Sequence, residues 1–141
     1  MSSLKKYDPP VSQDALDLVK KAKAVLVIGS GFGGILKSVA SVMDKGSLIV
    51  AVERDDFDAP AFLNAKASLK ETCRQLCLLG ARVELFLGDS HAQKLVQAVE
   101  GYAPYDFVFI NGDDKDVENY APMAYIMGRI KDSGIGIIYR E

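Results

Sequence analysis

The chain has 141 residues, of which 49% are hydrophobic and 26% charged, and its 17 basic and 19 acidic residues give a formal net charge of −2. This composition fits one globular domain over residues 1–141, with residues 1–11 as an N-terminal tail. The lack of a basic excess argues against a nucleic-acid partner, and the lack of a long apolar run or apolar leader argues against a membrane protein. We therefore expect a soluble, cytoplasmic protein.

Two cysteines and a single histidine narrow the possible chemistry. Cys73 and Cys77 lie four residues apart, which is neither the spacing of a C-x-x-C redox pair nor enough ligands for a structural metal. We interpret them as reduced thiols packed as small apolar groups. His91 is the only histidine, so a site built from several histidines is excluded.

After residue 11, short apolar runs alternate with helical stretches, the pattern of a parallel α/β sheet. Ser12 is a plausible N-cap for a first helix, and Pro122 is compatible only with the first turn of the last one. Ser90 and Gln93 have the spacing of a capping box. The expected helices cover 12–22, 34–43, about 60–79, 90–99 and 120–131, and the expected strands cover 24–28, 47–53, 82–87, 105–110 and 134–139.

The long segment between the second and third expected strands carries an apolar stripe typical of a helix that packs on a sheet. The stripe consists of Phe62, Ala65, Leu69, Cys73, Leu76 and Cys77, and Gly80 is its expected C-terminal stop. Together these elements predict a Rossmann-like, doubly wound, mostly parallel five-stranded sheet of order 3-2-1-4-5, with helices on both faces.

In such a sheet, ligands bind outside the carboxyl ends of the strands. Four polar segments fall there: the glycine-rich stretch 29–34 after the first strand, Glu53 at the end of the second, residues 88–90 after the third and residues 111–114 after the fourth. We expect these segments to meet at one ligand site.

The first segment matches G-x-G-x-x-G at Gly29, Gly31 and Gly34, between an expected strand and an expected helix. The glycines alone could simply form a tight turn. Glu53, 24 residues after Gly29, adds a carboxylate that can accept hydrogen bonds from both hydroxyls of a ribose. The combination indicates an adenosine-containing ligand, whereas a nucleoside-triphosphate loop is excluded because no Lys-Ser or Lys-Thr pair follows Gly34.

The charge at this edge helps to choose between a dinucleotide and S-adenosylmethionine. Arg54, Lys115 and His91 are the bases near it. The acids are Glu53, Asp55, Asp56, Asp58, Asp89, Asp113, Asp114 and Asp116. These carboxylates would oppose a pyrophosphate and would favour a sulfonium cation.

In their order, these motifs resemble the class I S-adenosylmethionine-dependent methyltransferases, in their small-molecule O-methyltransferase-like branch. The resemblance runs from about residue 11 to 139 and is carried by stretches 25–34, 46–53, 79–90, 105–114 and 130–134. It implies S-adenosylmethionine as cofactor and a small-molecule methyl acceptor. The cofactor-binding residues expected from the motifs are Gly29, Ser30, Gly31, Phe32, Glu53, Arg54, Gly88, Asp89, Ser90 and Asn111.

Methyl transfer requires positioning in line with the sulfonium and, for a hydroxyl acceptor, removal of a proton. Asp113 and Asp114 are the expected catalytic residues, and His91 is the next candidate.

The sequence also departs from the family pattern. Val27 replaces the acidic residue that usually precedes the first glycine by two positions. Asn111 and Asp114 replace the Asp and His of the divalent-cation-dependent members, so we expect no metal ion. The sequence ends before the final two strands of the family's sheet. A dinucleotide-binding oxidoreductase domain using NAD(P) or FAD, and a non-catalytic methyltransferase-like assembly module, therefore remain alternatives.

The expected last strand, 134–139, would lie at an edge of the sheet. An uncovered apolar edge favours pairing with another chain. We therefore expect a homodimer or larger homo-oligomer that uses this edge and the preceding helix, through Met123, Ile126, Met127 and Ile130.

Overall fold

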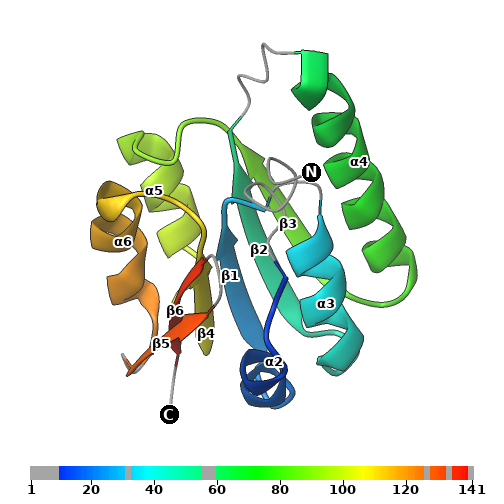
Figure 1. Ribbon diagram of the computed structural model, residues 1–141, viewed down its shortest axis with the longest axis vertical. Helices are drawn as coiled ribbons and strands as arrows, with labels where there is room; N and C mark the ends of the chain where they lie inside the picture. Colours follow the sequence, from blue (N-terminus) through cyan, green and yellow to red (C-terminus); the bar gives the residue numbers. More distant parts are fainter. Residues whose placement is uncertain (1–9, 31–32, 55–59, 126–127, 133–134, 140–141) are drawn as a thin grey trace.

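The computed structural model describes residues 10–30, 33–54, 60–125, 128–132 and 135–139. A six-stranded sheet of order β3-β2-β1-β4-β6-β5 lies between two layers of helices (Figure 1). The strands are β1 (Ala24–Ile28), β2 (Leu48–Glu53), β3 (Arg82–Leu87), β4 (Phe107–Ile110), β5 (Gly128–Asp132) and β6 (Ile135–Tyr139). The helices are α2 (Gln13–Val19), α3 (Gly34–Val42), α4 (Pro60–Leu78), α5 (Gln93–Glu100) and α6 (Asp114–Tyr120), which a 3₁₀ turn, η1 (Ala121–Met123), follows.

The first four strands form the expected parallel core. β1 pairs in parallel with β2 on one side and with β4 on the other, and β2 pairs in parallel with β3. Four of the five residues of β1 and all four residues of β4 are buried. Their continuous apolar sequences are those of strands covered on both faces, and the 3-2-1-4 part of the prediction is confirmed.

The expected five-stranded sheet is wrong in its last part. β6, which replaces the expected strand 134–139, pairs antiparallel with β4, and β5 pairs antiparallel with β6 at the sheet edge. β5 lies where the sequence predicted the end of helix 120–131. The β5–β6 hairpin thus adds two antiparallel strands to a four-stranded parallel core.

The last helix begins earlier than expected because Asp113 caps it. The Asp113 carboxylate accepts a hydrogen bond from the Asp116 backbone N–H, and the Asp116 carboxylate accepts one from the Asp113 N–H, which forms a capping box. Pro122, which has no N–H for a helical hydrogen bond, follows in η1. The helical period read from Tyr120 onward therefore belonged to a turn and a strand.

Each face of the sheet has its own core. Val25 and Val27 of β1 pack on the face covered by α2, α3 and α4, together with Phe107 and Phe109 of β4. The alternate residues of these strands face the other way, into a core that contains Val99 of α5 and Tyr120 of α6. Figure 1 shows α3 and α4 on one side of the sheet and α5 and α6 on the other.

The helix caps and the apolar stripe expected from the sequence are confirmed only in part. Ser12 caps α2 by accepting a hydrogen bond from the Ala15 N–H, as expected. Ser90 does not cap α5, whose N-cap is Ala92. Tyr105 precedes β4 as an isolated bridge to Ala124. In the expected stripe of α4, Cys77 is exposed, whereas Leu69, Cys73 and Leu76 are buried.

Strand 134–139 cannot be the sheet edge that pairs in a dimer. β6 is an interior strand, because β5 covers the side that would have been the edge. Met123 is only 5% exposed and belongs to η1, and Ile130 lies in β5. Ile126 and Met127 lie outside the described residues. No helix within the described part of the chain is both long and apolar enough to cross a membrane.

Candidate functional site

A cavity of about 570 Å³ opens at the carboxyl ends of the four parallel strands. It lies where strand order reverses, with β2 and β3 on one side of β1 and β4 on the other. Its lining residues are Ile28, Gly29, Val52, Glu53, Arg54, Gly88, Asp89, Ser90, His91, Asn111, Gly112, Asp113 and Asp116. All four segments expected at the ligand edge therefore contribute to one site.

Gly29 allows the ends of β1 and β4 to approach each other closely. Its φ is +80°, and a Cβ atom there would lie 2.1 Å from the carbonyl oxygen of Asn111. The Gly29 N–H donates to the Val52 carbonyl at 2.9 Å, while the Asn111 N–H donates to the Ile28 carbonyl at 2.8 Å. A side chain at position 29 would force these backbone segments apart.

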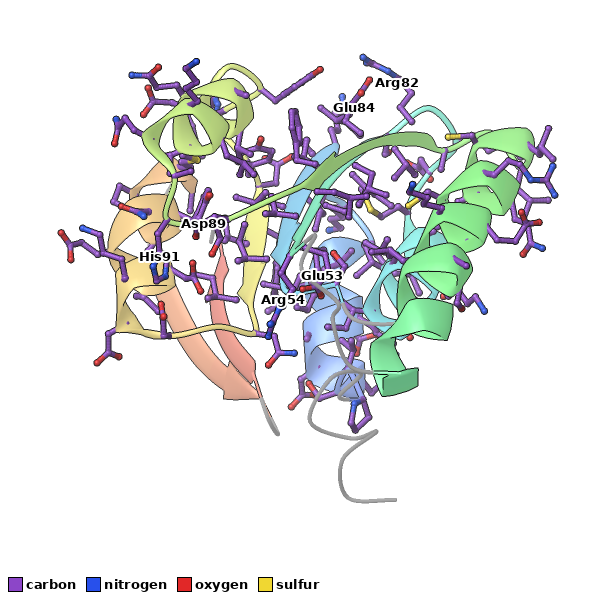
Figure 2. The ribbon with its side chains drawn as sticks, turned by 90° about the horizontal axis from the view of Figure 1, so that it is seen from above. Glu53, Arg54, Arg82, Glu84, Asp89 and His91 are labelled. Atoms are coloured by element: carbon purple, nitrogen blue, oxygen red, sulfur yellow. The ribbon has the colours of Figure 1, made fainter. Side chains whose placement is uncertain are left out.

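Glu53 and Arg54 form the wall at the end of β2. The Arg54 N–H donates to Glu53 Oε1 at 2.8 Å, and the Gly88 N–H donates to the Glu53 carbonyl at 2.9 Å. The second bond fixes the start of the loop after β3 beside the end of β2. In Figure 2, Glu53 and Arg54 lie together near the middle of the molecule, away from Arg82 and Glu84 at the outer edge.

The loop after β3 is joined to α6 by side chains. The Ser90 hydroxyl donates to Asp116 Oδ1, and the Tyr120 hydroxyl donates to the Ser90 carbonyl at 2.7 Å. Within the loop, the His91 N–H donates to Asp89 Oδ1 at 2.9 Å. These bonds connect segments that follow β3 and β4, two strands separated in the sheet by β2 and β1.

His91 and two carboxylates complete this wall. The Nε2 atom of His91 lies 3.0 Å from Asp113 Oδ1 and 3.5 Å from Asp116 Oδ1. The bond to Asp113, with the charges of Asp113, Asp116 and Asp89, raises the pKa of His91. The pKa of Asp113 is lowered, first by the Asp116 backbone N–H and then by His91.

Gly112 makes room for Asp116. A Cβ atom at position 112 would lie 2.2 Å from Asp116 Oδ2, so only glycine fits beside this carboxylate. Asp116 is 6% exposed, and its two oxygens accept from the Ser90 hydroxyl and the Asp113 N–H.

His91, Asp113 and Asp116 are the one group of metal-type donors found within the described residues, their donor atoms lying within 4.8 Å of one another. Because His91 Nε2 lies within hydrogen-bond distance of Asp113 Oδ1 and the pKa of His91 is raised, we interpret the group as a hydrogen-bonded ion pair.

Most of the residues expected from the sequence are brought together. Gly29, Glu53, Arg54, Gly88, Asp89, Ser90, Asn111 and Asp113 all line the cavity. Ser30 is fully buried outside the lining, close to the Val52 carbonyl. Asp114 is exposed as the first residue of α6 and does not line the cavity. Gly31 and Phe32 lie outside the described residues.

The sequence patterns indicate Asp116 only as one of the acids of the ligand edge, and they do not indicate Gly112. The spacing Asp113-x-x-Asp116, read as a helix N-terminus, could have identified both, because a capping carboxylate must lie close to the backbone that it caps.

A second hollow, of about 340 Å³, lies between α3 and α4 at the other end of β2. The two helices approach closely at Gly33, where a Cβ atom would lie 2.9 Å from Thr72 Oγ1. They separate toward Met43 and Leu79, which line the hollow. None of the ligand motifs falls there.

Comparison with known proteins supports the fold. No family model and no curated protein matches the sequence. Among solved structures, a methyltransferase from Geobacter sulfurreducens is 17% identical, with a TM-score of 0.58, over 94% of this chain and 80% of that protein.

Two further solved structures of similar fold contain S-adenosylmethionine (SAM) or S-adenosylhomocysteine (SAH). The O-methyltransferase TomG from Streptomyces achromogenes, involved in tomaymycin synthesis and in complex with SAM, is 16% identical with a TM-score of 0.62, over 91% of this chain and 61% of its own. The O-methyltransferase from Bacillus cereus in complex with SAH is 14% identical with a TM-score of 0.55, over 99% of this chain and 86% of its own. The resemblance to class I methyltransferases is confirmed at the level of the fold.

Proposed function

We propose that this chain, which has the fold of the class I S-adenosylmethionine-dependent methyltransferases, binds S-adenosylmethionine and transfers its methyl group to a small-molecule acceptor. The observation that carries the proposal is the single cavity in which the Gly29 turn, Glu53, the Asp89–Ser90 loop and Asn111 meet. Two structural neighbours contain SAM or SAH, which supports the same cofactor.

The residues present fit this cofactor. A volume of about 570 Å³ lies within the usual range of small-molecule sites, about 300–1,000 Å³. The Glu53 carboxylate suits a pair of ribose hydroxyls, and Asp89 suits an exocyclic amino group. Four carboxylates line the cavity, from Glu53, Asp89, Asp113 and Asp116, against the bases Arg54 and His91.

When bound, S-adenosylmethionine would supply a methyl group activated by a positively charged sulfur. The chain would contribute mainly binding and orientation, together with carboxylates that favour the cation. Asp113, which lines the cavity, is the better placed of the two expected catalytic residues. Its lowered pKa keeps it ionised, and it would accept the proton of a hydroxyl acceptor only weakly.

Isothermal titration calorimetry with S-adenosylmethionine, S-adenosylhomocysteine and NAD tests the proposal. We expect the first two to bind and NAD not to bind, since the carboxylates oppose a pyrophosphate. Binding of NAD alone would instead support an oxidoreductase domain. Binding of none of the three would support a non-catalytic assembly module.

Self-association and a cytoplasmic location are part of this proposal, and they rest on the sequence. The sheet has two outer edges within the described residues, those of β3 and β5, and the edge of β5 is the one that lies nearest the contact expected from the sequence.

A further inference from the structure

The imidazole of His91 lies where the loop after β3 contacts the start of α6, at one wall of the cavity. His91 follows the Asp89–Ser90 loop at the end of β3, whereas Asp113 and Asp116 belong to the start of α6. Figure 2 shows Asp89 and His91 together on the side of α5 and α6. The His91 side chain is 40% exposed, so it can exchange protons with solvent while it remains in contact with both carboxylates.

The groups that face His91 are mostly acidic. Asp113 and Asp116 face it from α6, and Asp89 faces it from its own loop. Tyr120 of α6 reaches the same loop, but its hydroxyl donates to the Ser90 carbonyl, and its pKa is raised above the ordinary value by burial. Lys115, the lysine of α6, lies beside Glu118 instead. The His91 cation therefore offsets part of the negative charge of the three carboxylates at this contact.

We propose that His91 is a positioning residue of the adenosyl-ligand site: in its charged form it holds the loop that carries Asp89 and Ser90 against α6. Loss of the charge leaves three neighbouring carboxylates without their cation, which loosens the loop that presents Asp89 to the ligand. This inference rests on the proposed function, because it assigns a role at the same site.

The sign of the expected pH dependence follows from the contacts. His91 has a raised pKa in the folded chain, so its charge is fully present below the ordinary value of about 6.5 and is lost as the pH rises through the raised value. Ligand affinity should therefore fall as the pH rises. By reciprocity, a bound ligand should raise the pKa of His91 further.

The test measures how pH changes the ligand affinity and how ligand binding changes the pKa of His91. Because His91 is the only histidine, its ring C–H signal can be followed by NMR without ambiguity in a tag-free protein. The probe is 5′-methylthioadenosine, which has an adenosyl group but no group that titrates near neutral pH. We expect its affinity by calorimetry to fall about threefold to fivefold between about pH 6 and about pH 9, and the pKa of His91 to be higher in the bound state.

Variants separate the charge from the shape of the side chain. His91→Gln should show the weaker affinity at both pH values, and His91→Arg should restore affinity and remove the pH dependence. Glu118→Gln is the matched control on α6, because Glu118 is exposed and pairs with Lys115. We expect it to behave like the parent.

Three results would overturn the inference. The first is an equal pKa of His91 with and without the probe, and the second is a His91→Gln variant that binds like the parent. The third is a pH dependence that appears only with added Mn²⁺ and disappears with EDTA, which would make the cluster a cation site. If neither 5′-methylthioadenosine nor S-adenosylhomocysteine binds at any pH, the proposed function itself fails.

Discussion

Glu53 and Asp89 are the side chains that we expect to contribute most to ligand affinity. Replacing either by alanine removes a charged hydrogen-bond acceptor, worth about 1.5–3 kcal/mol, or roughly tenfold and more in affinity. Calorimetry with S-adenosylhomocysteine measures the effect. Glu84→Ala is the matched control, since Glu84 is exposed on β3 at the outer edge of the sheet (Figure 2). Parental affinity in folded Glu53→Ala and Asp89→Ala variants would place the site elsewhere.

Gly29 is the residue at which a single methyl group should destabilise the chain most clearly. Gly29→Ala combines a left-handed backbone with a Cβ atom 2.1 Å from the Asn111 carbonyl oxygen. We expect a loss of about 3 kcal/mol or more in the free energy of unfolding by denaturant.

Gly46→Ala separates the cost of the left-handed backbone from the cost of the contact with Asn111. Gly46 has a φ of +83°, but nothing lies within 4 Å of a Cβ atom there. This variant should lose only the backbone term of about 1–2 kcal/mol. Equal losses at the two positions would show that the contact with Asn111 is unimportant.

At the scale of elements, the starts of β1 and β4 are joined by one carboxylate. Asp106 Oδ2 accepts from the backbone N–H of Lys23 at 2.8 Å and from that of Ala24 at 3.3 Å. Asp106→Ala leaves these donors without this acceptor and should lower the free energy of unfolding by about 1–3 kcal/mol. Denaturant unfolding measures the loss, and Glu84→Ala should be close to neutral. An unchanged Asp106→Ala variant would mean that water replaces the carboxylate at no cost.

The strands β1 and β3 have the bounds that the sequence predicted, because β1 is a continuous apolar run that ends at Gly29 and β3 is an alternating run between Gly80 and Gly88. The region after Tyr120 was mispredicted because its apolar spacing fits either a helix or a strand. The choice there depends on pairing with β6, a tertiary contact. Asp113 and Pro122 contained the local signal for an earlier helix.

The contact of His91 with Asp113 could not be predicted from local sequence. The two residues are 22 positions apart and follow strands that are not neighbours in the sheet. They meet because α5 and α6 cover the same face. Glu53 and Asn111 were predictable, since the carboxyl ends of parallel strands always share one edge.

At the scale of the whole molecule, self-association is a prediction that concerns the outer edge of β5. Sedimentation equilibrium at micromolar concentration should show a dimer or larger species. A species of 15.3 kDa at every concentration would contradict it. The sequence of β5, Gly-Arg-Ile-Lys-Asp, contains three charged residues, so an association through this strand should depend on salt.

The position of β4 beside β1 also sets the order in which the chain can assemble during synthesis. Lys23 and Asp106, which join the two strands, are 83 residues apart in sequence. Until β4 leaves the ribosome, the backbone N–H and C=O groups along one edge of β1 lack their partner strand, and the floor of the ligand cavity does not exist. Nascent chains that do not yet include β4 should therefore depend on chaperones, and cofactor should not stabilise them. Both properties should change abruptly once residues 107–110 emerge.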